Sequence, residues 1–425
     1  MESTPARWSQ RMVEVAILGF AFFSPWSIAG AQTCLAVALM AWVVKLVASR
    51  GRGFQRTPMD LPILAFLGIE LLSVLLSPNL LRGLWALRQE WIVLLFFLVV
   101  NNVHDQRFAR RILDLLVAVT SIVCLYAIWQ HFAGWDLYRC RPLVFDGNAF
   151  HVIGLFGNHL TFGGYVMVVL LTSGCLFFGG TKGRRRIYFG LASLILSLAL
   201  IWSYTRSAWL GLVGGIMGIG LLRGRKTLAL VLIGIVIVAG LLVLLQPSIR
   251  LRMKATADAL QDPTVKPKRI QMWSASVKII RDHPLLGVGV GRMKMSMVAY
   301  GCHLGYAHPH NDLLNVAAQA GLLGLAAFLW IWLTFLTMAA RCWSHQQSRG
   351  FSGSLTTAGF GLMIAFLVAG LFQCYYTDAE DGMILWFLLG LVTAVCKLEG
   401  GYGGVSSDPP RLKSVESRKG KATSG

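Results

Sequence analysis

Long apolar stretches separated by short polar segments follow one another along most of the chain. Each stretch is about as long as a helix that crosses a bilayer, roughly 17 to 25 residues. The predicted fold is therefore an all-α, polytopic integral membrane protein. The pattern predicts twelve transmembrane helices, at residues 13–30, 33–48, 60–77, 90–103, 112–131, 162–180, 187–203, 207–222, 227–246, 312–339, 355–374 and 382–397.

Basic residues indicate the orientation of these helices. If the N-terminus is cytoplasmic, every short loop on the cytoplasmic side contains Lys or Arg, which is the usual bias of membrane proteins. Both termini are then cytoplasmic. The chain divides into a membrane bundle of nine helices (1–246), a large periplasmic loop between helices nine and ten (247–311), three further membrane helices (312–397) and a basic tail typical of disorder (398–425).

Composition narrows the class of protein further. The 425 residues are 56% hydrophobic and 14% charged, and the mean hydropathy of +0.62 excludes a soluble domain. The net charge of +20 first suggests nucleic acid, but basic cytoplasmic loops explain it, so we predict no nucleic-acid partner. The eight cysteines include no CxxC pair, which disfavours a zinc or redox site.

The long periplasmic loop is basic on the side where Lys and Arg are usually depleted. Residues 246–309 contain ten basic and three acidic residues. Lipid headgroups would balance this charge, and so would a phosphate or pyrophosphate held by arginine forks. Apolar residues at helical spacing predict an amphipathic helix at 267–281, with Arg269 in its first turn.

Three alternating glycines, Gly287, Gly289 and Gly291, follow that helix. They resemble a nucleotide-binding loop only superficially, because no strand precedes them. The favoured interpretation is a tight bend that lets the backbone approach a ligand or another helix.

A polar cluster stands where the loop returns to the membrane: His308, His310, Asn311 and Asp312. Two imidazoles beside an amide and a carboxylate favour proton transfer, because histidine titrates near neutral pH. The structural alternative is a helix start capped by Asn311 or Asp312. The clustering, and the basic loop before it, favour chemistry.

Arg206 lies in a very short outer connection between two apolar helices. An arginine at membrane depth is a functional hypothesis by default. The alternative is a side chain that reaches for the interface, aided by Trp202 and Trp209. Arg88, before the predicted helix 90–103, is a similar but weaker case.

Three blocks together resemble the O-antigen ligase family of the O-antigen ligase and polymerase superfamily. They are residues 204–210 (YTRSAWL), the stretch from Arg269 to Gly289, and His310-Asn311 with Gly321 and Gly324 downstream. The arrangement of twelve helices with one large periplasmic loop is also similar to that family.

The resemblance implies a glycosyl transfer at the periplasmic face of the inner membrane of a Gram-negative bacterium. The donor would be O-antigen linked to undecaprenyl pyrophosphate, a membrane lipid. The acceptor would be a sugar hydroxyl of lipid A–core oligosaccharide, and the product lipopolysaccharide. No metal or other cofactor is implied, in agreement with the lack of a Walker loop or DxD pair.

The resemblance also implies roles for individual residues. His310 would take the acceptor proton, because the family pattern places its histidine directly before Asn, and Arg206 and Arg269 would hold the pyrophosphate. Direct displacement would invert the anomeric centre. Beyond the resemblance, charge and position predict Arg88, His308, Asn311, Arg281 and Arg292 as further substrate-binding residues, with His308 as the rival base.

Other functions share these features. An O-antigen polymerase or a protein O-oligosaccharyltransferase would use the same donor and the same histidine with a different acceptor. A non-catalytic lipid-glycan transporter is the alternative from another class. Inverted repeats and charged, interrupted helices near the midplane would favour it, and the sequence shows neither.

Overall fold

The computed structural model describes residues 4–50, 54–145, 149–245, 268–345 and 350–400. Regular structure in these ranges is almost entirely helical. The one paired sheet within them joins β1 (Trp135–Asp136) to β2 (Arg141–Pro142) in antiparallel register. Most of the predicted tail, residues 401–425, lies outside the described residues.

The helical elements follow one another along the chain with short connections. They are α1 (Thr4–Phe23), α2 (Ile28–Ala48), α3 (Asp60–Leu75), α4 (Leu80–Leu87), η1 (Arg88–Val93), α5 (Leu94–Asn102), α6 (Gln106–Ala133), α7 (His159–Cys175), η2 (Leu176–Gly180), α8 (Gly183–Trp202), α9 (Arg206–Arg223), α10 (Arg225–Leu245), α12 (Lys268–Asp282), α13 (Met293–Ala299), α14 (Asp312–His345), α15 (Gly350–Gly370) and α16 (Ala379–Leu398).

A helix covers each predicted apolar stretch, so the polytopic helical class is confirmed. Within the described ranges, eight helical segments are long and apolar enough to cross a membrane. Twelve crossings, and the periplasmic side of the long loop, stay predictions. The eight segments are 28–48, 80–102, 106–133, 159–180, 183–202, 312–344, 350–370 and 379–398.

The fourth predicted helix begins earlier than expected. Asn79 Oδ1 accepts a hydrogen bond from Arg82 N at 3.2 Å and caps α4. Helical backbone then continues through η1 into α5. Arg88 was predicted to precede the helix, but it lies inside this continuous segment because capping outweighs the polarity of residues 88–90.

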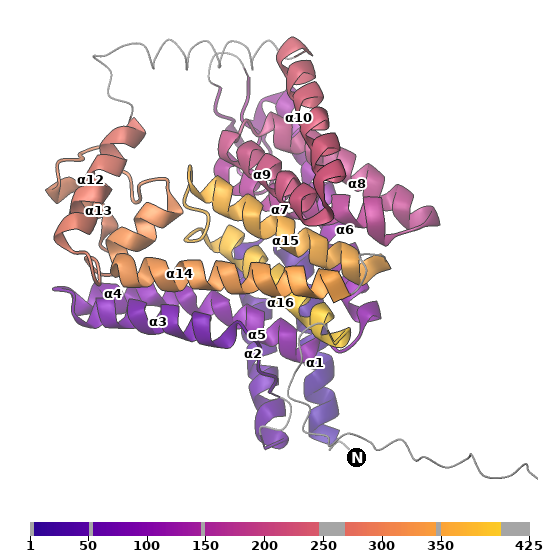
Figure 1. The fold of residues 1–425 in the computed structure, drawn as a ribbon, viewed down its shortest axis with the longest axis horizontal. Helices are drawn as coiled ribbons and strands as arrows, with labels where there is room; N and C mark the ends of the chain where they lie inside the picture. Colours follow the sequence, from indigo (N-terminus) through magenta and orange to yellow (C-terminus); the bar gives the residue numbers. More distant parts are fainter. Residues whose placement is uncertain (1–3, 51–53, 146–148, 246–267, 346–349, 401–425) are drawn as a thin grey trace, which may run out of the picture.

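The core of the bundle is made by α7, α15 and α16, the spans that are most buried. α15 packs on α7, α9 and α14, and α16 packs on α5. α14 runs along α3, and α12 and α13 form a lobe against the first part of α14 (Figure 1).

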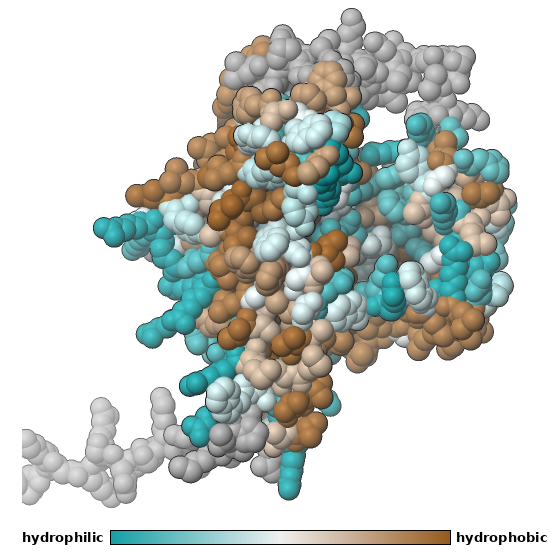
Figure 2. Space-filling model, turned by 180° about the vertical axis from the view of Figure 1, so that it is seen from behind, coloured by the Kyte–Doolittle hydropathy of each residue, from teal (hydrophilic) through white to brown (hydrophobic). Residues whose placement is uncertain are grey.

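A hollow separates this lobe from the rest of the bundle in the view from behind, and hydrophilic residues line it (Figure 2). Below it, an apolar face follows α3 and α4, where large hydrophobic side chains are exposed, among them Leu61, Leu64, Leu76 and Leu81. Exposed leucines at these positions suit contact with lipid rather than water.

α14 is broken at Gly321, which has φ 73° and ψ −175°. The sequence predicted an uninterrupted helix here, so this part of the prediction was wrong. The physical reason is a second segment that pairs with the opened backbone. Leu322 N donates to Pro284 O at 2.7 Å, Val288 N to Ala318 O at 3.0 Å, and Gly289 N to Gln319 O at 3.0 Å.

The alternating glycines therefore form a bend that docks on another helix, as predicted. A Cβ on Gly287 would lie 2.5 Å from Gln319 O, and one on Gly321 would lie 2.0 Å from Leu285 O. Ser73 of α3 completes the junction: its hydroxyl oxygen is 2.6 Å from Leu286 O and 2.8 Å from Gln319 O. Backbone groups freed by the break are thus satisfied, which a helix inside a membrane requires.

Candidate active site

His310 stands between the lobe and α14 in a backbone conformation that is uncommon for residues other than glycine. Its φ is 53°, in the left-handed region. Contacts on both neighbours hold this turn: Trp273 Nε1 of α12 donates to Pro309 O at 3.1 Å, and Asn311 Nδ2 donates to Leu371 O at 3.0 Å. Strained backbone of this kind, held from two sides, is typical of functional sites.

Asn311 and Asp312 both have structural roles at the start of α14. Asn311 Oδ1 accepts a hydrogen bond from Leu314 N at 2.9 Å. Of the two residues predicted as possible caps, Asn311 is therefore the one that caps the helix. Asp312 is buried, and its carboxylate accepts the backbone N–H groups of Tyr375 and Tyr376, each at 3.2 Å. The loop between α15 and α16 is thereby fixed against the residues that follow His310.

Gln373 of that loop contacts the imidazole directly. Its Oε1 hydrogen-bonds with Nδ1 of His310, and the Gln373 side chain is buried. A neutral imidazole that donates its Nδ1–H to this oxygen keeps the lone pair of Nε2. This tautomer allows Nε2 to accept a proton from a substrate hydroxyl.

His308 packs edge-on against His310, with ring centroids 4.7 Å apart. Burial, and secondarily the nearby charge of His310, lower the pKa of His308 from 6.5 to about 4. Its Nδ1 is buried and has no hydrogen-bond partner among the described residues. His308 is therefore neutral at pH 7 and shapes an apolar wall beside His310.

The two arginines that the sequence singled out come together in space. Arg206 is the first residue of α9, after a turn in which Tyr204 has φ 53° and Thr205 Oγ1 donates to His159 O at 2.7 Å. Arg269 lies in the first turn of α12. Partial burial lowers the pKa of Arg269, and the positive charge of Arg206 lowers it further.

Two guanidinium groups close enough for one charge to lower the pKa of the other form a cationic pair that could bind an anion. Arg206 begins α9 and Arg269 stands near the start of α12, where backbone N–H groups and the helix dipole also favour negative charge. A phosphate group would neutralise both side chains and could accept paired hydrogen bonds from each.

Tyr375 connects the arginine pair to the histidine. Its hydroxyl lies 2.8 Å from Ser207 Oγ, beside Arg206, and is close enough to Arg269 to influence the pKa of that arginine. Its backbone N–H is bound by Asp312. Burial raises the pKa of Tyr375, so the hydroxyl stays protonated and available as a hydrogen-bond donor.

Other predicted residues lie away from this cluster. Arg281 is exposed in the last turn of α12, about 18 Å along the helix axis from Arg269. Arg292 Nη1 donates to Val288 O at 3.2 Å and braces the glycine bend. Arg88 stacks on Trp85, with 3.7 Å from its guanidinium carbon to the ring centre.

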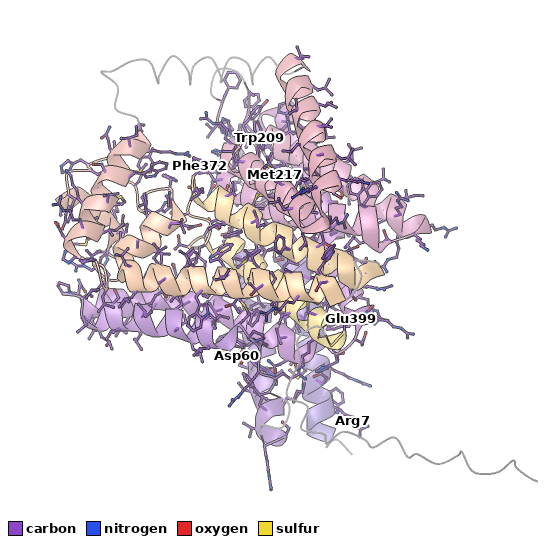
Figure 3. The ribbon with its side chains drawn as sticks, in the orientation of Figure 1. Arg7, Asp60, Trp209, Met217, Phe372 and Glu399 are labelled. Carbon is purple, nitrogen blue, oxygen red and sulfur yellow. The ribbon has the colours of Figure 1, made fainter. Side chains whose placement is uncertain are left out.

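Figure 3 shows where the loop between α15 and α16 lies in the bundle. Phe372, labelled there, lies at the end of the bundle between the α12–α13 lobe and the region of Trp209 on α9. Gln373 and Tyr375 follow it directly in the chain. Sequence reasoning missed both residues, and the one signal that could have found them is a polar Gln-Cys-Tyr-Tyr run at the outer end of an apolar helix.

Comparison with known families agrees with this grouping. Residues 191–329 match the family model described as O-antigen ligase. The match confirms the resemblance to the O-antigen ligase and polymerase superfamily, and it includes Arg206, Arg269 and His310. It supports a glycosyltransferase-like activity of the ligase or polymerase type, with lipid-linked glycans as substrates. Comparison with curated proteins finds no match.

The O-antigen ligase match ends before α15. Gln373 and Tyr375 therefore lie outside it. Their place in the site rests on the hydrogen bonds described above.

Proposed function

We propose that the protein is an O-antigen ligase that transfers a glycan from undecaprenyl pyrophosphate to a sugar hydroxyl of lipid A–core oligosaccharide. The reaction takes place at the periplasmic face of the bacterial inner membrane. The observation that carries the proposal is the grouping of two arginines, close enough for the charge of Arg206 to lower the pKa of Arg269, with a histidine whose Nδ1 contacts Gln373.

The reaction is a single displacement at the anomeric carbon of the donor. The acceptor oxygen forms the new glycosidic bond as its proton passes to Nε2 of His310. The bond between the anomeric carbon and the phosphate oxygen breaks, and undecaprenyl pyrophosphate leaves with the electron pair. Attack opposite the leaving group inverts the anomeric centre.

Each group has a distinct part in lowering the barrier. A positioned general base contributes about 10²–10⁴-fold, and an imidazole suits neutral pH. Arg206 and Arg269 stabilise the charge that develops on the leaving pyrophosphate, and removal of one such donor typically costs about 2.7–4 kcal/mol. Gln373 orients His310, and Tyr375 offers a hydroxyl beside the phosphates.

A reconstitution tests this proposal. Purified protein in liposomes is mixed with undecaprenyl-pyrophosphate-linked O-antigen and rough lipopolysaccharide, without metal or nucleotide, and products are separated on a gel. We expect a lipopolysaccharide ladder with the wild type and with His303→Ala, an exposed histidine of the same lobe. We expect the ladder to be lost in His310→Ala.

The other outcomes separate the alternatives. Longer lipid-linked glycan without transfer to lipid A–core would identify a polymerase. Transfer to an added pilin and not to lipid A–core would identify a protein glycosyltransferase. A full ladder from His310→Ala would exclude His310 as the base, and unchanged substrates with the wild type would favour transport without catalysis.

A further inference from the structure

A polar cavity lies beside the loop that carries Gln373. It measures about 420 Å³, at the lower end of the range for small-ligand sites of about 300–1,000 Å³. Its walls come from α2, η1 and the loop between α15 and α16. The polar and aromatic residues that line it are Gln32, Arg88, Gln89, Glu90, Trp91, Tyr376 and Thr377.

Charges of both signs meet in this cavity. Glu90 supplies a carboxylate, which accepts a hydrogen bond from Tyr376 Oη at 3.0 Å. Arg88 supplies a guanidinium, whose face rests on the Trp85 ring. A neutral hydroxyl can hydrogen-bond with both the carboxyl group and the guanidinium.

The remaining groups suit a ligand with many hydroxyls. Gln32 and Gln89 each offer two N–H donors and a carbonyl acceptor, and Glu90 keeps acceptor capacity beyond its bond to Tyr376. Trp91 is half-buried in the wall and gives a flat apolar surface with a polar edge. Donors, acceptors and an aromatic face together fit the hydroxyls and the C–H face of a sugar ring.

The cavity and the arginine pair lie on opposite sides of one short segment. Tyr375 directs its hydroxyl to Ser207, next to Arg206, whereas Tyr376 directs its hydroxyl to Glu90. Asp312 holds the backbone N–H groups of both tyrosines. A ligand in the cavity is therefore separated from the phosphate position, while Tyr376 in the cavity wall is held by the same Asp312 carboxylate as Tyr375.

We propose that this cavity binds a neutral sugar residue of one of the two glycan substrates. The inference rests on the proposed function for the source of the sugar, which is either the acceptor core oligosaccharide or the donor glycan. Gln89 and Glu90 hydrogen-bond its hydroxyls, and Trp91 stacks against its ring.

Binding and kinetics test the cavity separately. The full chain in nanodiscs is titrated calorimetrically with lipid-free core oligosaccharide and, in a second arm, with O-antigen glycan released from its carrier. Gln89→Ala and Trp91→Ala are compared with Trp91→Phe and with Lys294→Ala, an exposed control on α13. Thermal unfolding checks that each variant is folded.

We expect one glycan to bind about three- to tenfold more weakly to Gln89→Ala and to Trp91→Ala, as loss of one hydrogen bond or stacking contact predicts. Trp91→Phe should bind better than Trp91→Ala. In the transfer assay, KM for that same glycan should rise by a similar factor while kcat stays within about twofold. The glycan affected identifies the source of the sugar.

Failure of the cavity proposal and failure of the proposed function are distinguishable. Unchanged affinity for both glycans in folded Gln89→Ala and Trp91→Ala would overturn the sugar site, as would a wild type that binds neither. Weakened binding in a protein without transfer activity would overturn the ligase function and support the sugar site.

Discussion

Replacement of the glycine at the break of α14 by alanine should lower stability by an amount that can be worked out from the structure. Gly321 has φ 73° and ψ −175°, a region that essentially only glycine occupies and that costs another residue about 1–3 kcal/mol. In Gly321→Ala the new Cβ would also lie 2.0 Å from Leu285 O. The obstacle is backbone, so no side-chain rotation relieves it.

Relief of this contact requires the docked loop to move away from α14. The hydrogen bonds Leu322 N to Pro284 O (2.7 Å) and Leu323 N to Leu285 O (3.4 Å) would then be lost or lengthened. At about 0.5–1.5 kcal/mol for each bond, the total expected loss for Gly321→Ala is about 2–6 kcal/mol.

Unfolding in mixed micelles of a mild detergent and dodecyl sulfate measures this loss. The matched control is Gly68→Ala, a helical glycine of the neighbouring α3 whose added Cβ would meet nothing within 4 Å. The control is expected to be unchanged or more stable by up to about 1 kcal/mol. Equal stability of Gly321→Ala and Gly68→Ala would refute the docking argument.

Three further predictions concern the site. Gln373→Ala should lower kcat of transfer by about 10- to 100-fold, part of the 10²–10⁴-fold that a base contributes, with KM nearly unchanged; equal kcat would show that His310 needs no orientation. Arg269→Lys keeps the charge but loses the fork, so initial rates should show kcat/KM for the donor reduced roughly tenfold or more; wild-type rates would argue against paired phosphate contacts. The pKa of His308 falls from 6.5 to about 4 on folding, so the unfolded chain binds more protons between these values and stability should decline as the pH falls through that window. Unfolding titrations of the wild type and His308→Gln should differ in slope there and run parallel above pH 6.5, and identical slopes would contradict the assigned burial.

Much of the helical framework was predictable, because length and apolar composition decide whether a segment crosses a bilayer. The limits appear where a local signal competes with packing. Arg82 and Arg88 made residues before 90 resemble a loop, yet capping by Asn79 extends the helix through them. Gly321 resembled an ordinary helix glycine, because the loop that docks there was not visible in its neighbours.

The site residues also differ in whether the sequence could predict them. His310, Arg206 and Arg269 were predictable because titratable or charged side chains stand out against apolar surroundings. Gln373 and Tyr375 are neutral residues at the end of an apolar helix, and only the three-dimensional structure shows why they matter. Gln373 lies 63 residues from the histidine that it contacts. Conversely, Arg281 stands out in the sequence by its charge, but it lies far along α12 from Arg269.

The junction at Ser73 also bears on how the protein is made. Its hydroxyl belongs to α3, which leaves the ribosome early, whereas its acceptors on Leu286 and Gln319 are synthesised more than 200 residues later. The α12–α13 lobe therefore completes its fold only after α14 has been inserted beside α3. Residues 268–311 expressed alone, as an antigen or a soluble fragment, would lack Ser73 of α3 and Gln319 of α14. This fragment is therefore not expected to reproduce the native lobe.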